Sequence, residues 1–152
     1  MSPATDRKAL SHERIVDVAA RAIRRAGYGG VGVADIMKEA GLTHGGFYAH
    51  FASRNALLVE AMQRAGRDSA AVMAARLAQK QAEGVSAFAA LLQSYLNEQH
   101  LAGAEHGCAV AALASEMPRQ ADEVVDAART RVLALVELVA RCLPAGTDPA
   151  QA

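Results

Sequence analysis

The chain has 152 residues, 52% of them hydrophobic, so it can bury a substantial core in one domain or in a small headpiece and a small body. Only 4% are aromatic and the helix formers Ala and Leu are frequent, which favours an all-α fold, and two cysteines exclude a disulfide framework or a four-cysteine zinc site. The formal net charge is zero, but nine basic and six acidic residues lie at or before Arg64, so a basic first part precedes an acidic remainder.

Residues 1–10 are polar, and we expect them to form a flexible arm. The arm lacks the unbroken apolar stretch of a signal peptide, and no window approaches twenty uninterrupted apolar residues. We therefore expect a cytoplasmic protein without a membrane segment. A first helix follows the arm, because Ile15, Val18 and Ala22 recur at helical spacing, and Gly27 ends it.

Two short helices and one long helix are predicted next. The first covers residues 33–40 and stops at Gly41, which permits a left-handed turn. The second covers residues 43–50. Ser53 is a good N-cap for the long helix, whose apolar residues keep a helical period with nothing to break them before Gly84.

The remainder of the chain is also predicted to be helical. Helices are expected around 88–96, from 108 towards 117 and over about 120–143, with a connector at 103–107. In the last helix we expect an inward face made of Val124, Val125, Ala128, Val132, Leu135, Val136 and Val139. The sequence thus divides into an arm (1–10), a helix-turn-helix domain (11–53) and a helical regulatory domain (54–152).

The segment at residues 34–51, ADIMKEAGLTHGGFYAHF, has the pattern of a short helix, a tight glycine turn and a second short helix. Ala40 is small enough for the helices to cross closely, and Leu42 is an apolar plug between them. A helix-turn-helix of this kind places its second helix in the major groove of DNA. Together with Gly27, Ile36 and the pair Leu57-Leu58, the segment closely resembles the DNA-binding headpiece of the TetR family over roughly residues 11–62.

The resemblance implies a role for each matching position. Thr43 would contact a phosphate, and His44, Gly45 and Gly46 would lie nearest the base edges. Tyr48 and His50 would donate to phosphates, and Arg54 would bind one from the start of the long helix. Val33 is a further candidate DNA-contact residue.

Two positions depart from the family pattern. Gly32 and Ala34 stand where the family often has polar residues, so fewer backbone contacts and more reading of DNA shape are expected. Phe47 and Phe51 are interpreted as headpiece core.

The resemblance also implies that the helical body binds a small molecule and forms a homodimer, so that two headpieces read a palindromic operator. The candidates for lining a ligand cavity are Phe88, Leu92, Tyr95, Leu113 and Met117, although the helical spacing of each favours packing in a core over lining a cavity. Cys108 opens a predicted helix beside His106, so it is a candidate sensor of oxidants or electrophiles or, alternatively, a small buried hydrophobe. Family members carry two further helices beyond Leu143, which this sequence is expected to lack.

The sequence therefore predicts a DNA-binding transcriptional regulator, by family default a repressor, with no enzymatic activity, no cofactor and no metal site. An all-helical carboxylate-bridged enzyme is disfavoured, because no Glu has a His three residues later. A small-molecule-binding or interaction module that has lost specific DNA binding remains the alternative, motivated by Gly32 and Ala34.

Overall fold

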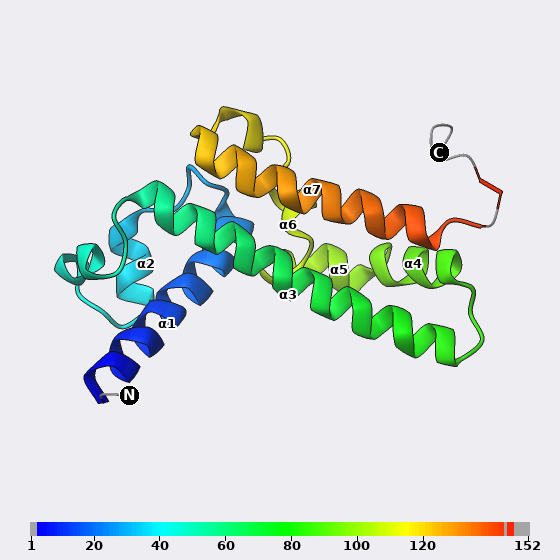
Figure 1. The fold of residues 1–152 in the computed structure, drawn as a ribbon, viewed down its shortest axis with the longest axis horizontal. Helices are drawn as coiled ribbons and strands as arrows, with labels where there is room; N and C mark the ends of the chain where they lie inside the picture. Colours follow the sequence, from blue (N-terminus) through cyan, green and yellow to red (C-terminus); the bar gives the residue numbers. More distant parts are fainter. Residues whose placement is uncertain (1–2, 145, 148–152) are drawn as a thin grey trace.

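The computed structural model describes residues 3–144 and 146–147 and contains helices and no strand in that part of the chain, which confirms the all-α class (Figure 1). In chain order the elements are α1 (Pro3–Ala26), α2 (Val33–Glu39), the 3₁₀ helix η1 (His44–Ala49), α3 (Arg54–Ala82), α4 (Ala87–Tyr95), α5 (Glu98–Ala102), η2 (Ala104–His106), α6 (Ala109–Leu113), η3 (Met117–Arg119) and α7 (Asp122–Cys142). The long α3 runs through the middle of the molecule, with α1 and α2 at one end, α4 at the other, and α7 alongside it (Figure 1).

The first helix is longer than the sequence predicted. α1 begins at Pro3, so residues 3–10, where the sequence predicted an arm, are part of this helix, while residues 1–2 lie outside the described part. Proline is tolerated in the first turn, where its missing N–H has no helical partner, and Asp6 lies at the favourable end of the helix dipole. The polar composition of this segment therefore reflects exposure to solvent, not an absence of helix.

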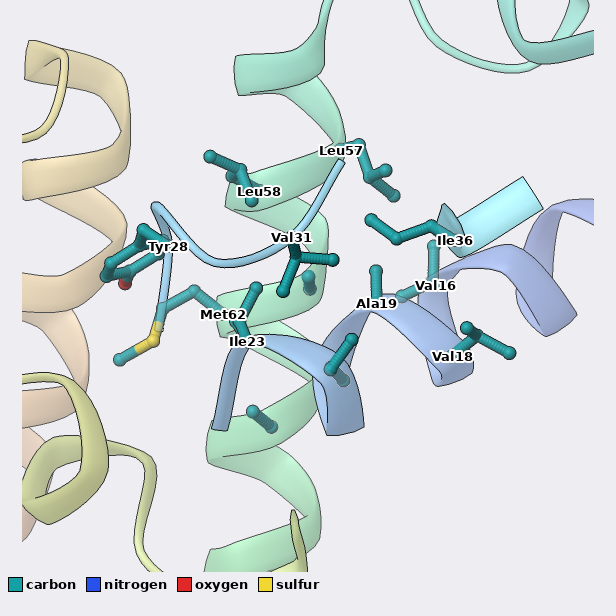
Figure 2. Close-up of a cluster of buried hydrophobic side chains, with 14 of the residues drawn as sticks. Val16, Val18, Ala19, Ile23, Tyr28, Val31, Ile36, Leu57, Leu58 and Met62 are labelled. Carbon is teal, nitrogen blue, oxygen red and sulfur yellow. The ribbon is translucent and has the colours of Figure 1, made fainter. Parts of the chain in front are cut away.

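One hydrophobic core joins the headpiece to the body. Its members in the close-up of Figure 2 include Val16, Ile23, Tyr28, Val31, Ile36, Leu57, Leu58 and Met62. The same cluster continues into Leu113, Met117 and Val124, from the segment between α6 and the start of α7. The division predicted between residues 53 and 54 falls at the N-cap of α3, where the Ser53 side chain accepts from the Ala56 N–H at 3.0 Å, and apolar packing runs across it.

A second, smaller cluster lies at the far end of α3. It consists of Met73, Leu77, Ala90, Leu91 and Cys142, contributed by α3, α4 and α7. The 29 residues of α3, about 43 Å at the usual helical rise, therefore take part in both clusters. This single helix connects the headpiece rigidly to the remote end of the body.

The inward face predicted for the last helix is only partly correct. Val124 and Ala128 are buried, but Val132, Val136 and Val139 are exposed, by 36%, 58% and 37%. Leu133, beside them, is 56% exposed. Helical periodicity identifies apolar stripes but not which neighbour covers them, and α7 carries two such stripes. We call Val132, Leu133, Val136 and Val139 the α7 stripe.

Candidate functional site

A tight glycine turn joins α2 to η1. Gly41 has a φ of 69°, a left-handed conformation that glycine adopts without strain. Leu42 N–H donates to the Met37 carbonyl at 2.8 Å, and Gly41 N–H donates to the Lys38 carbonyl at 3.0 Å. This pair of bonds is the Schellman motif that ends helices, so the helix-turn-helix predicted over residues 34–51 is present.

The second helix of this motif differs from the prediction. An ordinary helix was expected over residues 43–50, whereas His44–Ala49 form the 3₁₀ helix η1. Gly46 N–H donates to the Thr43 carbonyl at 3.0 Å, and His50 N–H donates to the Phe47 carbonyl at 2.9 Å. The physical reason is the pair Gly45-Gly46, which lowers helix propensity in a segment too short to compensate.

Two aromatic rings anchor η1 to the core. Phe47 and Phe51 are 2% and 3% exposed, and their rings stack with centroids 5.6 Å apart. Their interpretation as headpiece core is confirmed. With one side of η1 fixed in this way, its other side faces solvent.

Four of the predicted DNA-contact residues are exposed there: Thr43, His44, Gly45 and Tyr48, the last by 74%. Gly46 and His50 are half-buried. A Cβ added at Gly45 would meet nothing within 4 Å, so the backbone is open to an approaching surface. Hydroxyl, imidazole and bare backbone groups are the kinds that contact phosphates and base edges.

The other two predicted residues lie differently. The Arg54 guanidinium donates to the carbonyls of Tyr28 and, at 3.3 Å, Val31, so it fixes the loop between α1 and α2. Val33 is half-buried and packs against the main core. Both residues thus help to position the motif. Gly32 is the N-cap of α2 and has no side-chain cap, as its sequence departure implied.

His50 lies in a partly apolar environment within the headpiece. Its Nδ1 atom is buried and has no hydrogen-bond partner within the described residues, and its ring is 6.0 Å from that of His12. Burial, followed by the nearby His12 and Lys8, lowers the pKa of His50. His12 in turn lies 2.7 Å from Glu60 Oε2 on α3.

A carboxylate from the body holds the end of α1. Glu116 Oε2 accepts from the N–H groups of Tyr28 at 2.9 Å and Gly29 at 3.3 Å. Gly27 has a φ of 75°, and a Cβ added there would overlap the Glu116 carboxylate, so glycine is required on both counts. This contact joins the headpiece to the segment between α6 and η3.

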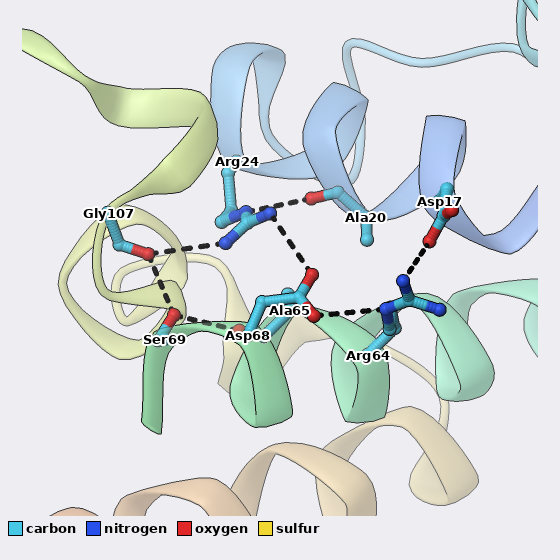
Figure 3. A network of polar contacts seen from close by, with 8 residues as sticks. All are labelled: Asp17, Ala20, Arg24, Arg64, Ala65, Asp68, Ser69 and Gly107. Atoms are coloured by element: carbon cyan, nitrogen blue, oxygen red, sulfur yellow. Dashed lines mark hydrogen bonds and ion pairs between the residues drawn. The ribbon is translucent and has the colours of Figure 1, made fainter. Parts of the chain in front are cut away.

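A buried arginine makes a second junction (Figure 3). Arg24 is 4% exposed, and its guanidinium donates to the carbonyls of Ala20 at 3.0 Å and Gly107 at 3.4 Å. Ser69 Oγ on α3 donates to the same Gly107 carbonyl at 2.8 Å. Burial lowers the pKa of Arg24, while Asp68, whose carboxylate lies 4.0 Å away, opposes that shift. The Gly107 carbonyl is therefore a shared acceptor between headpiece and body.

The body contains a cavity of about 100 Å³ between α3, α7 and the segment from Tyr95 to Val110. Ser69 and Gly107 line it, so the cavity borders the Arg24 junction directly. Cys108, the half-buried N-cap residue of α6, and Tyr95 also line it. Burial, followed by the nearby Cys108 side chain, raises the pKa of Tyr95 to about 12.

The other predicted cavity residues lie elsewhere. Leu113 and Met117 are in the main core, Leu92 is 41% exposed, and Phe88 is half-buried on α4 outside the lining. Sequence reasoning missed Arg131 and Gly66, which both line the cavity. A signal was available, because Arg131 occupies the spacing of the buried face of α7 and Gly66 interrupts a long helix without ending it.

Residues 15–61 match the family model described as bacterial regulatory proteins, tetR family. The chain resembles the structure of E. coli NemR in its reduced form, with a TM-score of 0.70 and 20% identity over 93% of this chain and 78% of that one. It also resembles a transcriptional regulator of the TetR family from Agrobacterium tumefaciens, with a TM-score of 0.72 and 23% identity over 95% of this chain and 80% of that one. No curated protein matches the sequence. Among the described residues, no helix is long and apolar enough to cross a membrane.

Proposed function

Given a TetR-family DNA-binding headpiece at residues 15–61 and the helical fold of TetR-family regulators, we propose that this chain is a transcriptional repressor that a small molecule, electrophile or oxidant releases from its operator. The observation that carries the proposal is the outer side of η1. Thr43, His44 and Tyr48 are exposed there while Phe47 is fixed in the core. A short polar element held out from a packed headpiece suits insertion into the major groove.

The cavity supplies the regulatory half of the proposal. Its wall includes Gly107, whose carbonyl accepts from both Arg24 in α1 and Ser69 in α3. A ligand or modification that displaces Gly107 would alter the hold on α1 and, through the shared core, the angle of the headpiece. Coupling of this kind needs the signal to favour one arrangement of the junction over the other.

DNA binding is tested by fluorescence anisotropy on fragments selected from genomic DNA, over a series of salt concentrations. Wild-type chain is expected to select a palindromic fragment, with affinity falling steeply as salt rises. Tyr48→Phe, which removes only a hydroxyl, is expected to weaken binding about fivefold, the value of one hydrogen bond. Lys80→Gln, at the far end of α3, serves as the matched control and should leave affinity unchanged.

The alternative, a module that has lost specific DNA binding, makes a different prediction for the same experiment. It requires weak binding that is indifferent to sequence, and no effect of Tyr48→Phe beyond that of Lys80→Gln. That result would contradict the repressor proposal and leave the cavity as the functional site.

The chemical signal is tested at Cys108. Its thiol borders the cavity, which Tyr95 also lines, whereas Cys142 is buried in the second cluster. Iodoacetamide, which alkylates a thiol with loss of iodide, is expected to lower DNA affinity of the wild type and of Cys142→Ser. Cys108→Ser should resist the reagent. Equal sensitivity of the two variants would contradict a sensing role for Cys108.

The dimer is proposed to form through the α7 stripe. Isolated exposed apolar side chains are ordinary, but four large ones on one helix face mark an interaction surface. Arg129 and Glu137 lie one turn to either side of Leu133 and carry opposite charges. In an antiparallel pair of α7 helices centred on Leu133, each Arg129 would face Glu137 of the second copy, so the charges complement each other.

A further inference from the structure

The cavity between α3 and α7 carries an excess of positive charge. Four of its lining side chains, Arg76, Arg131, His100 and His106, can be cationic, and no acidic side chain is among the described residues that line it. The rest of the wall is largely apolar, including Met73 from α3 and Leu135 and Leu138 from α7. Cationic groups at an apolar wall without a counter-ion favour an anionic occupant.

Of these four side chains, Arg131 is the best candidate to bind an anion. It lies in no ion pair within the described part of the chain, and its Nε atom is buried without a hydrogen-bond partner. A buried guanidinium N–H left unsatisfied is costly, and a ligand that accepts from it recovers that free energy. The site is also shaped around this side chain, since a Cβ at Gly66 would overlap its Cδ.

A second arginine approaches from the other side. Arg76 on α3 lines the cavity, and its one recorded hydrogen bond, Nη1 to the Ser94 carbonyl, is long at 3.4 Å. The Tyr95 hydroxyl, with its pKa raised to about 12, stays protonated at neutral pH. The polar groups at the wall are therefore mostly donors, which suits a carboxylate, because a carboxylate only accepts.

We propose that the cavity binds a small carboxylate with an apolar body, and that the guanidinium of Arg131 is its counter-ion. The carboxylate accepts from Arg131, and the apolar body lies against α3 and α7. The inference rests on the proposed function for its biological meaning, since the carboxylate would be the class of signal that releases DNA. Binding itself involves only the free chain.

The experiment is calorimetric titration of the full chain, without DNA, with benzoate, benzamide and benzyl alcohol. These probes share an aromatic body, and only benzoate carries a charge. Benzoate is expected to bind at least about tenfold more tightly than either neutral probe, as for a charge-assisted hydrogen bond in a partly apolar site. Benzoate that binds no better than benzamide would overturn the proposal.

Two arginine variants give the matched comparison. Arg131→Gln should abolish the preference for benzoate, while Arg67→Gln, which removes the same charge from an exposed position on α3, should keep it. Arg131→Lys restores the charge and should restore part of the preference, which separates loss of the counter-ion from damage to the fold. A preference for benzoate that survives Arg131→Gln would also overturn the proposal.

DNA binding is measured separately on the same preparation. Benzoate binding through Arg131 in a chain that does not bind DNA would support this inference and contradict the repressor. Selective DNA binding without any preference for benzoate would support the repressor and contradict this inference.

Discussion

Arg24 is buried, and the hydrogen-bond acceptors around its guanidinium offset the free-energy cost of burying the charge. The side chain is 4% exposed and donates to two backbone carbonyls, one in its own helix and one at Gly107. Asp68, the nearest carboxylate, is shared with Arg64 at 3.0 Å. Arg24 thus acts mainly as a donor that ties α1 to the segment before α6, and less as half of an ion pair.

Truncating this side chain should destabilise the fold. Arg24→Ala is expected to lower the free energy of unfolding by about 1–3 kcal/mol, because it removes buried packing and both hydrogen bonds. Arg14→Ala, on the exposed face of the same helix, should change it by less than about 0.5 kcal/mol. Urea unfolding followed by circular dichroism measures both variants. Equal losses in the free energy of unfolding of the two variants would contradict a role for Arg24 in joining α1 to the segment before α6.

His50 should make the headpiece sensitive to acid. Its folded-state pKa is lowered by burial, His12 and Lys8, from an unfolded value near 6.5. The unfolded chain then binds the proton more readily, so the free energy of unfolding falls as the pH drops through about 6.5 towards the folded-state pKa. His50→Gln cannot take up that proton, and its unfolding curves between pH 7.5 and 5.5 should show a smaller decline than wild type. The same decline in both proteins would contradict this account.

Among the elements, η1 combines a low helix propensity with an accessible backbone. Gly45 has no positive φ and no atom within 4 Å of an added Cβ, so the fold does not require glycine there. Gly41 and Gly27, in contrast, adopt left-handed conformations that the turns need. In the proposed repressor the reason for glycine at this position would be contact with DNA, since a bare backbone can approach base edges closely.

The variant Gly45→Ala separates the effect of this position on fold stability from its effect on DNA binding. The free energy of unfolding is expected to stay constant or rise by up to about 1 kcal/mol, because alanine has the higher helix propensity. Operator affinity should fall by about tenfold, equivalent to 1.4 kcal/mol, as the methyl group keeps the backbone from the groove. Gly29→Ala, also in open space but on the loop after α1, is the control and should leave affinity unchanged. Unchanged affinity in Gly45→Ala would mean that the backbone of η1 does not approach DNA closely.

The elements also show what the sequence could predict. Local chemistry determined the glycine turn at Gly41, the N-cap at Ser53 and the burial of Phe47, and all three were predicted correctly. The outward position of Leu133 and the isolation of Arg131 depend on which helix lies beside α7, and periodicity within one helix does not contain that information. The 3₁₀ form of η1 results from two glycines acting together in six residues, which a per-residue propensity underestimates.

At the scale of the whole molecule, the proposed repressor requires that the two headpieces of a dimer meet one operator. A dimer reads half-sites one helical turn of DNA apart, about 34–36 Å, so each copy must hold its η1 at a fixed distance from the dimer axis. The continuous core along α1, α3 and α7 provides that rigidity. The headpiece lies beside the first turns of α3 and α7 (Figure 1). Because Leu133 is near the middle of α7 in sequence, an axis there would leave both headpieces away from the contact.

A single charge in the α7 stripe should separate the two copies. Leu133→Glu places two carboxylates at the centre of the proposed antiparallel contact, where they would repel each other and lose solvation. Wild type is expected to scatter light as a particle of twice 15.9 kDa, and Leu133→Glu as a monomer with unchanged helical content. Leu101→Glu, at an 86% exposed leucine on α5, is the control and should stay dimeric. Because each monomer would reach only one half-site, Leu133→Glu should also lose selective operator binding. A wild-type monomer would contradict the proposed dimer, and a dimer that survives Leu133→Glu would place its axis elsewhere than on this stripe.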